Sequence, residues 1–380
     1  MNRGETIENV IKAVILRNEP IPFERFMDMA LYYPSFGYYT SPGREIGRAG
    51  DFYTASHLHP LFGAVIARQL EECWDILGKP GTFTVAEQGA GKGYLALDIL
   101  DYLKGRALYD ALSYTLVEMS PSQVSSQERL LKDHRKKVQW KNDLKEVPPF
   151  TGCYLSNELP DAFPVHLVQM EDRLREVYVG LQDDRFIEIL AEPSTPKLSE
   201  YLSEFDITLA KGYRTEINLR IKDWLAGVSE KISEGFIITI DYGYTAQEYY
   251  SGERDRGTLL CYFRHQVNEN PYEHIGEQDI TSHVNFSSLK QWGEKLGLKT
   301  LGYCSQGTYL VSMGLDEVVR EKYRLDEREP DQEYQFEAAK LKGLILPGAM
   351  GESHKVMLQY KGDHEVKPRG FMIRNRLRAL

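Results

Sequence analysis

The chain has 380 residues, of which 42% are hydrophobic and 27% are charged, a composition typical of a globular protein with a buried core. Its formal net charge of −10 argues against a nucleic-acid partner, because surfaces that bind nucleic acid carry clusters of Lys and Arg. No apolar run approaches the length of a membrane span. An acidic surface instead suits a cationic partner, such as a Lys- or Arg-rich segment of a protein.

Residues 1–80 are expected to form a helical N-terminal extension that precedes the main sheet. Apolar side chains recur at helical spacing over 7–15, and a second helix is predicted over 23–31. A third helix is predicted over 60–77. Aromatic and glycine residues dominate the segment before this third helix, which indicates a loop.

From residue 82 onward, short apolar strands alternate with helical stretches. Buried strands are predicted at 83–86, 114–117, 138–140, 153–156 and 236–240. Helices are predicted after the first two strands, over 95–103 and 121–133. This alternation predicts an α/β fold with a doubly wound, mostly parallel, Rossmann-like sheet that carries helices on both faces.

Two segments interrupt the alternation. Residues 166–234 form a predicted insertion that begins with antiparallel strands at 166–170, 176–181 and 186–190. Residues 247–283 are polar, which favours a substrate-side loop or lid. The core of the fold is therefore assigned to 81–165, 235–246 and 284–361, and residues 362–380 to a basic C-terminal tail.

A glycine-rich loop, Glu87-Gln88-Gly89-Ala90-Gly91-Lys92-Gly93, directly follows the first predicted strand and opens a helix. Its three glycines let the backbone turn sharply and approach a ligand closely. A dinucleotide-binding loop has its third glycine one position later, where this chain has Tyr94. The spacing, with Glu87 two residues ahead, resembles the first motif of class I methyltransferases, whose cofactor is S-adenosyl-L-methionine. A carboxylate there suits the ammonium group of this cofactor and would repel a pyrophosphate.

Further markers stand at the ends of the next two predicted strands. Glu118 can accept hydrogen bonds from both ribose hydroxyls, and Asn142 with Asp143 can meet the adenine amino group. Each has a structural alternative: Glu118 as a solvated strand end, and Asp143 as a turn residue, which is the more frequent role of Asp. Because parallel strands present their carboxyl ends at one edge, the three markers together predict a single cofactor site.

Motifs along nearly the whole chain resemble those of the MidA-like methyltransferases, a family that includes the mitochondrial complex I assembly-factor arginine methyltransferase. The matching blocks, in chain order, are 33–39, Gly50-Asp51-Phe52 with Thr54, 87–93, 116–118 with 120–121, 157–159, 161–166, 241–243, 279–281 with 283–284, and 350–352. The Asn-Glu pair that opens block 157–159, followed by Asp-Ala-Phe-Pro-Val-His in block 161–166, is specific to this group.

The resemblance implies that S-adenosyl-L-methionine is bound and that its methyl group passes to an arginine of a protein, in the mitochondrial case a subunit of complex I. It also implies that four residues lie over the cofactor: Gly50, Asp51, Phe52 and Thr54. One departure concerns the substrate. Where the family usually has Ser-Pro-Glu after Thr54, this chain has Ala55-Ser56-His57, which leaves substrate identity open.

The methyl acceptor is expected beside the end of the fourth predicted strand. Transfer from a sulfonium is an in-line displacement, so catalysis depends on positioning, and a protonated arginine needs a carboxylate to orient it and accept a proton. We assign Glu158 as guanidinium clamp and proton acceptor, Asn157 as an orienting amide, and Asp161 as a second carboxylate. Asp161 has an alternative role as a helix cap.

No metal site is predicted. His57 and His59 are close in sequence, but no cysteine or third histidine joins them at a ligand spacing. Two rival functions fit the same fold. A small-molecule methyltransferase would have its pocket closed by residues 247–283, and an assembly chaperone would keep a bound cofactor but act by binding a partner.

A cytoplasmic location is expected from two features. The four cysteines stand far apart, as in a chain with reduced thiols. The first 18 residues carry Glu5 and Glu8 and show neither a signal-peptide nor a transit-peptide pattern.

Overall fold

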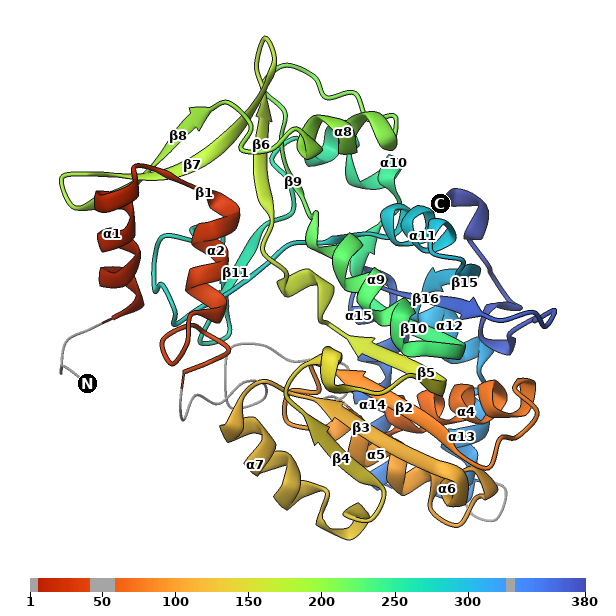
Figure 1. Cartoon of the computed structure of the whole chain (residues 1–380). Coiled ribbons are helices and arrows are strands. Elements are labelled where there is room, and N and C mark those ends of the chain that lie inside the picture. Colours follow the sequence, from red (N-terminus) through yellow and green to blue (C-terminus); the bar gives the residue numbers. More distant parts are fainter. Residues whose placement is uncertain (1–5, 42–58, 326–331) are drawn as a thin grey trace. The chain divides into compact units, whose positions relative to one another are not determined.

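The computed structural model of the chain describes residues 6–41, 59–325 and 332–380 (Figure 1). The chain divides into two compact units. Unit 1 comprises Met1–Phe52, Pro160–Trp224 and Tyr244–Ser288. Unit 2 comprises Tyr53–Leu159, Leu225–Gly243 and Leu289–Leu380. No helix in the described ranges is long and apolar enough to cross a membrane.

The central sheet of unit 2 is mostly parallel. Its strands follow the order β15-β16-β10-β5-β2-β3-β4. Their bounds are β2 Phe83–Gln88, β3 Leu112–Val117, β4 Val138–Lys141, β5 Phe150–Asn157, β10 Ile232–Tyr244, β15 Lys299–Ser305 and β16 His354–Lys361. The five strands from β10 to β4 pair in parallel, and β16 runs antiparallel to both of its neighbours. The predicted doubly wound, Rossmann-like class is confirmed.

Helices cover both faces of this sheet (Figure 1). They are α4 Leu61–Ile76, α5 Tyr94–Leu103, α6 Ala107–Ala111, α7 Pro121–Leu130, α9 Arg220–Lys231, α11 Phe286–Lys295, α12 Gln306–Ser312, α13 Leu315–Tyr323, α14 Gln332–Ile345 and α15 Met350–Ser353, with short 3₁₀ turns η1 Lys132–His134, η2 Leu144–Glu146, η5 Arg369–Phe371 and η6 Leu377–Ala379. Strand residues alternate between the two faces. On β16, Leu358 joins the core with α4 and α5, while the Gln359 amide donates to the Leu289 carbonyl of α11.

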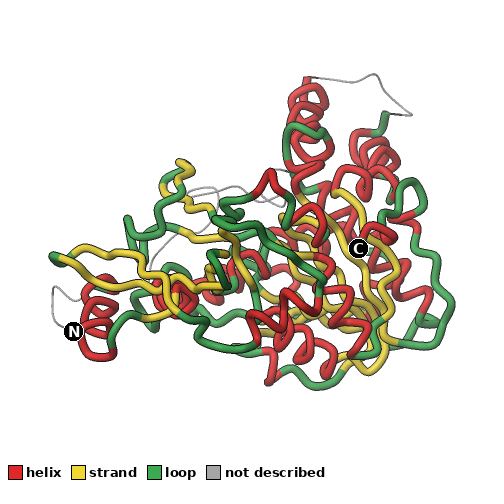
Figure 2. The backbone as a smooth tube through the Cα atoms, turned by 90° about the horizontal axis from the view of Figure 1, so that it is seen from above, coloured by secondary structure: helices red, strands yellow, loops and turns green. Residues whose placement is uncertain are grey.

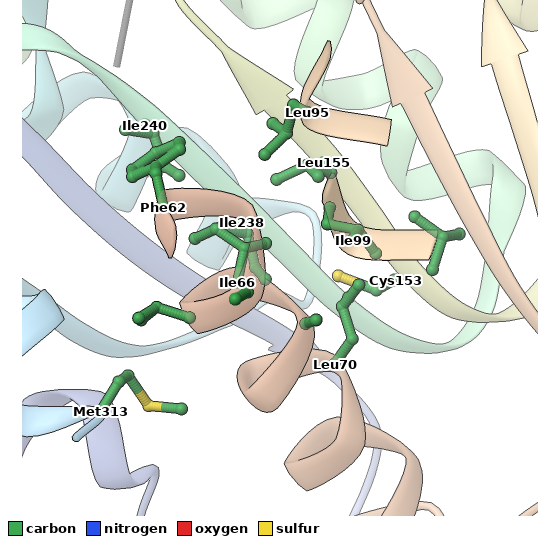
Figure 3. Close-up of a cluster of buried hydrophobic side chains, with 14 of the residues drawn as sticks. Phe62, Ile66, Leu70, Leu95, Ile99, Cys153, Leu155, Ile238, Ile240 and Met313 are labelled. Atoms are coloured by element: carbon green, nitrogen blue, oxygen red, sulfur yellow. The ribbon is translucent and has the colours of Figure 1, made fainter. Parts of the chain in front are cut away.

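The core of unit 2 forms where α4 and α5 meet the strands (Figure 3). Phe62, Ile66 and Leu70 recur at helical spacing on α4, so one face of the helix is apolar. Across from them, the strands contribute Cys153 and Leu155 from β5 and Ile238 and Ile240 from β10, all fully buried. This packing holds the carboxyl ends of the strands in a fixed array.

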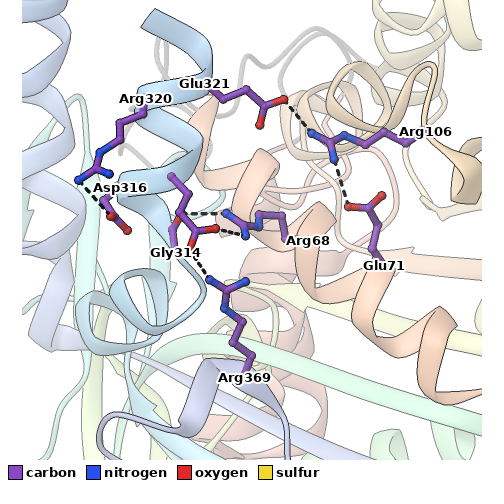
Figure 4. A network of polar contacts seen from close by, with 9 residues as sticks. Arg68, Glu71, Arg106, Gly314, Asp316, Arg320, Glu321 and Arg369 are labelled. Carbon is purple, nitrogen blue, oxygen red and sulfur yellow. Dashed lines mark hydrogen bonds and ion pairs between the residues drawn. The ribbon is translucent and has the colours of Figure 1, made fainter. Parts of the chain in front are cut away.

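The C-terminal segment is bound to unit 2. The guanidinium of Arg369 lies 2.6 Å from a Glu317 carboxylate oxygen, and Glu317 also pairs with Arg68 (Figure 4). Phe371 is buried in the core, against Gly302, where any added Cβ would lie 2.1 Å from the Phe371 ring. Exposed ion pairs stabilise little. The buried phenylalanine therefore contributes more than these ion pairs to holding the C-terminal segment, which the sequence describes only as basic.

Unit 1 contains two smaller antiparallel sheets. One has the order β1-β7-β6-β9, with β8 paired to β7, and the other has the order β12-β11-β13. Their bounds are β1 Ile21–Pro22, β6 His166–Met170, β7 Leu174–Gln182, β8 Arg185–Ala191, β9 Arg214–Ile217, β11 Leu260–Phe263, β12 Gln266–Asn268 and β13 Asp279–Thr281. The strands predicted between 166 and 190 are thus present, and the β7–β8 hairpin stands out in Figure 2.

Helices α1 Ile7–Asn18 and α2 Phe23–Tyr32 of unit 1 pack on the larger of these sheets. The unit also contains helices α8 Lys197–Glu204 and α10 Ala246–Tyr249, the 3₁₀ turns η3 Pro160–Ala162 and η4 Gly252–Arg254, and a short strand β14 Val284–Asn285. Phe23 and Phe26 of α2 are fully buried in a cluster with Val177 and Val179 of β7.

Residues 247–283 are more ordered than their polar composition predicts. They contain β11, β12 and β13, and a buried carboxylate holds the segment that leads into β11. Glu216 accepts hydrogen bonds from the backbone N–H groups of Thr258 and Leu259 and from the Tyr249 hydroxyl. Burial raises the pKa of Glu216, and these donors oppose that shift. Hydrogen bonds between residues so far apart in the sequence cannot be predicted from the local pattern of hydropathy.

The close approach of β5 to β2 at Gly152 predicts the effect of one substitution. Gly152 of β5 has φ +152°, and a Cβ there would lie 2.0 Å from the Thr84 carbonyl oxygen of β2. Gly152→Ala has to push two core strands apart, and we expect it to lower the free energy of unfolding by about 2 to 3 kcal/mol. Urea unfolding followed by tryptophan fluorescence measures this.

Gly81→Ala is the matched control, because Gly81 has open space around its missing Cβ. It should change stability by no more than about 0.5 kcal/mol. Equal stability of the Gly152 and Gly81 variants would contradict the close packing of β5 on β2.

Candidate cofactor and acceptor site

The glycine loop lies between β2 and α5. Gly89, Gly91 and Gly93 have φ values of +74°, +53° and +86°, in the left-handed region that favours glycine. A Cβ on Gly89 would lie 3.0 Å from the Leu159 side chain, and one on Gly93 would lie 3.2 Å from Gln127. A Cβ on Gly91 would meet no atom of the described residues within 4 Å. The backbone at Gly91 is therefore open to the approach of a ligand.

A buried glutamine joins this loop to the next strand end. The Nε2 group of Gln127, on α7, donates to the Gly91 carbonyl oxygen at 2.7 Å and to the Glu118 Oε2 at 3.3 Å. Its Oε1 accepts from the Trp140 indole at 2.9 Å. Gln127 thus brings two predicted cofactor residues together. Gln127 was not predicted from the sequence, because α7 is mostly polar and nothing in its pattern marks one glutamine as buried.

Glu118 is almost fully buried at the end of β3. Burial raises the pKa of its carboxyl group, while the hydrogen bonds from the Ser120 N–H and the Gln127 amide act in the opposite direction. Ser120 donates to Oε1, Gln127 donates to Oε2 and the Met119 N–H is a third donor, whereas a carboxylate has about four acceptor sites. The carboxylate can therefore still accept bonds from a ribose diol.

Glu87 is buried at the end of β2. Burial raises the pKa of this carboxyl to about 7, although the Tyr114 hydroxyl that donates to its Oε2 at 2.7 Å favours the ionised form. A cation beside it, such as the ammonium of an amino acid, would favour ionisation further. Glu87 is therefore suited to a cationic ligand group.

Asn142 and Asp143 are exposed after β4. The Asp143 Oδ1 accepts from the Lys145 N–H at 2.8 Å and caps η2, and the Asn142 N–H lies 3.4 Å from Glu146 Oε2. The Glu118 N–H donates to the Lys141 carbonyl, so the ends of β3 and β4 are adjacent. The adenine role of both residues remains a prediction. Four other predicted contacts lie outside the described residues: Gly50, Asp51, Phe52 and Thr54.

The predicted acceptor residues stand at the end of β5. Glu158 has φ +51°, an uncommon backbone conformation for a non-glycine residue, and its N–H donates to the Ile240 carbonyl of β10. Its side chain is only 3% exposed. The Asn157 amide donates to Glu158 Oε1 at 3.3 Å, while Glu158 Oε2 has no hydrogen-bond partner among the described residues. A buried carboxylate oxygen of this kind needs a ligand or water.

His354 is a further residue of this edge. It begins β16, is fully buried, and its Nε2 lies 3.5 Å from Glu158 Oε1. The ring of Tyr242, its partner residue on β10, lies 3.9 Å away between centroids. His354 was not predicted from the sequence, because a parallel βα pattern gives no register for a final antiparallel strand.

Asp161 belongs to unit 1, where it lies within η3. Its carbonyl oxygen accepts from the Ser282 N–H at 2.9 Å, and the neighbouring Ala162 carbonyl accepts from the Tyr32 hydroxyl. Burial raises the pKa of Tyr32, with the Asp279 and Asp161 carboxylates adding to the shift. Asp161 thus contributes negative charge to a buried part of unit 1.

No group of three or more potential metal ligands occurs within the described ranges. His59 is buried and used structurally. Its Nδ1 accepts from the Leu61 N–H, and its Nε2 lies 3.0 Å from a Glu337 carboxylate oxygen. Burial lowers the pKa of His59 to about 4, so the ring is neutral near pH 7.

The edge of the unit 2 sheet therefore offers an open glycine backbone at Gly91, a diol acceptor at Glu118 and a carboxylate at Glu87. These groups fit the nucleoside and amino-acid halves of S-adenosyl-L-methionine. Together with the doubly wound sheet, they define the class of S-adenosyl-L-methionine-dependent methyltransferases.

Comparison with known proteins gives the family. Residues 65–304 match the family described as "Putative S-adenosyl-L-methionine-dependent methyltransferase". A Burkholderia thailandensis protein crystallised with S-adenosyl-homocysteine superposes with a TM-score of 0.88 at 30% identity, covering 98% of this chain and 96% of that one. The chain belongs to this methyltransferase family, and the expected resemblance to MidA-like enzymes and the expected cofactor are confirmed.

Curated relatives bear more specific names. The mitochondrial protein arginine methyltransferase NDUFAF7 of Mus musculus is 29% identical over 366 residues, covering 88% of this chain and 79% of the relative. Its Drosophila melanogaster homologue is 27% identical over 337 residues, covering 80% and 74%. These relatives are mitochondrial, which contradicts the cytoplasmic prediction. The prediction rested on the spacing of the cysteines and on the pattern of the first 18 residues, and neither feature revealed this location.

Loss of the Gln127 amide should weaken cofactor binding. Gln127→Leu removes the bonds that hold Gly91 and Glu118, and we expect the Kd for S-adenosyl-homocysteine to rise about tenfold or more by calorimetry. Gln123→Leu is the matched control, since Gln123 is also buried on α7 and makes none of these bonds. Equal affinities for the two variants would show that Gln127 does not support the site.

The pKa of Glu87 predicts a pH dependence of binding. Because the ionised carboxylate attracts the ligand ammonium, protonation below the pKa of about 7 opposes binding. The affinity for S-adenosyl-homocysteine should therefore fall by up to about fivefold from pH 7 to pH 6. Glu87→Gln should lose this dependence, and an unchanged pH profile in that variant would exclude Glu87 from contact with the ammonium.

Proposed function

We propose that the enzyme transfers a methyl group to an arginine side chain of a protein, with Glu158 as clamp and proton acceptor. The observation that carries this proposal is the buried Glu158 carboxylate, whose Oε2 has no hydrogen-bond partner in the described part of the chain. A guanidinium would supply both the missing hydrogen bonds and the opposite charge. The curated relatives, which are named as protein arginine methyltransferases, support the same substrate.

The reaction requires a proton acceptor. A guanidinium is protonated at neutral pH, so it must lose a proton as the new N–C bond forms. The cofactor supplies an electrophilic methyl group, and the chain supplies the carboxylate that receives the proton. Asn157 orients Glu158 through its amide, and Asp161 is proposed as a second carboxylate for the acceptor.

The protein partner is proposed from the family resemblance. The resemblance to MidA-like enzymes implies a respiratory-complex subunit as the acceptor in the mitochondrial case, so a subunit of that kind is the first protein substrate to test. The net charge of −10 suits an arginine-bearing, basic segment of such a subunit.

Labelled-methyl transfer from S-adenosyl-L-methionine into protein of a hypomethylated lysate, followed by mass spectrometry, tests this function. The expected result is label on arginine. Label confined to small molecules would favour a small-molecule methyltransferase, and cofactor binding without any transfer would favour an assembly chaperone. Either outcome would overturn the proposal.

Glu158→Gln should separate catalysis from cofactor binding. The glutamine keeps the shape of the side chain but cannot accept the proton, so we expect turnover to fall by about a hundredfold or more. The Kd for S-adenosyl-homocysteine should change by less than about twofold. Glu230→Gln, on an exposed part of α9, is the control and should match the wild-type rate. Full activity of the Glu158 variant would remove it from the mechanism.

A further inference from the structure

Methyl transfer to a guanidinium releases one proton for each turnover, and a buried carboxylate must pass it on. The S–C bond of the cofactor breaks as the N–C bond forms, and the displaced N–H proton goes to Glu158. The side chain of Glu158 is only 3% exposed, so direct release of the proton to bulk water is restricted. A route from Glu158 to the surface is therefore needed.

His354 stands between Glu158 and an exposed residue. Its Nε2 lies 3.5 Å from Glu158 Oε1, and its Nδ1 lies 3.2 Å from the hydroxyl oxygen of Ser353. Ser353 is exposed at the end of α15, whereas the imidazole is fully buried. The three side chains therefore form a continuous series from the buried carboxylate to solvent.

The hydrogen bonds indicate which imidazole nitrogen is protonated. In the arrangement that the relay uses, the Ser353 hydroxyl donates to the Ala349 carbonyl oxygen at 3.3 Å and accepts from a protonated Nδ1 of His354 at 3.2 Å. The lone pair of Nε2 then faces Glu158, and Nε2 has no hydrogen-bond partner among the described residues. A proton placed on Glu158 would complete a hydrogen bond across the 3.5 Å gap.

Packing holds the ring in this place. Strand register pairs His354 of β16 with Tyr242 of β10, and the two rings lie 3.9 Å apart between centroids. The Glu158 N–H is bonded to the carbonyl of Ile240, two residues before Tyr242 on the same strand. Contacts with β10 thus position both the Glu158 carboxylate and the His354 imidazole.

We propose that His354 is a proton relay that carries the proton released in methyl transfer from Glu158 to Ser353 and water. Nε2 receives the proton from Glu158 while Nδ1 gives its own proton to Ser353, whose hydroxyl proton passes to solvent. A half-turn of the imidazole about its Cβ–Cγ bond then restores the starting tautomer before the next turnover. No oxidant or further reactant is involved. This inference rests on the proposed function, because it assigns the proton to an arginine acceptor.

Removal of the imidazole tests the relay. For His354→Ala we expect the initial rate of labelled-methyl incorporation into lysate protein to fall by about a hundredfold at saturating S-adenosyl-L-methionine. The KM for the cofactor and the Kd for S-adenosyl-homocysteine should stay within about twofold of wild type, which also reports a folded cofactor site. Added free imidazole should restore part of the lost rate, because it can take the vacated place.

Two further variants separate a relay from a structural role. His354→Asn can still hydrogen-bond to Glu158 but cannot relay a proton, so it should be as slow as the alanine variant. His364→Asn, a substitution of an exposed histidine, should leave the rate unchanged. A His354→Asn variant of wild-type rate, or an alanine variant that imidazole does not rescue, would overturn the relay. Absence of label on arginine in the wild-type enzyme would instead refute the proposed function itself.

Discussion

The hydrogen bonds of the Gln127 amide are the constraint on which the proposed cofactor site depends. They join the Gly91 carbonyl, in the loop after β2, to the Glu118 carboxylate, at the end of β3. Trp140 on β4 holds the other end of the same amide. Three neighbouring strand ends are thus tied to one side chain, and the glycine loop keeps its left-handed turns with the Gly91 backbone open to a ligand. Positioning of this precision is what an in-line displacement requires.

Much of the fold could be predicted because its signals are local. The apolar runs at 83–86 and 236–240 lie within β2 and β10, and the antiparallel strands between 166 and 190 appear as β6, β7 and β8. The antiparallel β16 and the small sheet of β11, β12 and β13 were missed. Their pairing depends on partners far along the chain. The buried Glu216 holds the segment that leads into β11, but its local sequence does not distinguish it from a surface glutamate.

The site residues that lie in motifs at strand ends could be predicted. The residues that contact them from distant parts of the chain could not. The glycine loop, Glu118 and the Asn157-Glu158 pair all follow strands directly, so the carboxyl edge of a parallel sheet predicts their neighbourhood. Gln127 and His354 become visible only in three dimensions, since one lies on a polar helix and the other begins a strand far downstream. Both contact the predicted residues. The prediction of the cellular location failed for a different reason, because the fold does not determine location.

The central claim is that the edge formed by the glycine loop and Glu118 is shaped for the nucleoside of S-adenosyl-L-methionine. A crystal structure of this chain soaked with S-adenosyl-homocysteine tests it most directly. The account predicts both ribose hydroxyls within hydrogen-bond distance of the Glu118 carboxylate and the amino-acid end of the ligand against the backbone at Gly91. A ribose bound elsewhere, with the Glu118 carboxylate touching only Ser120 and Gln127, would contradict it.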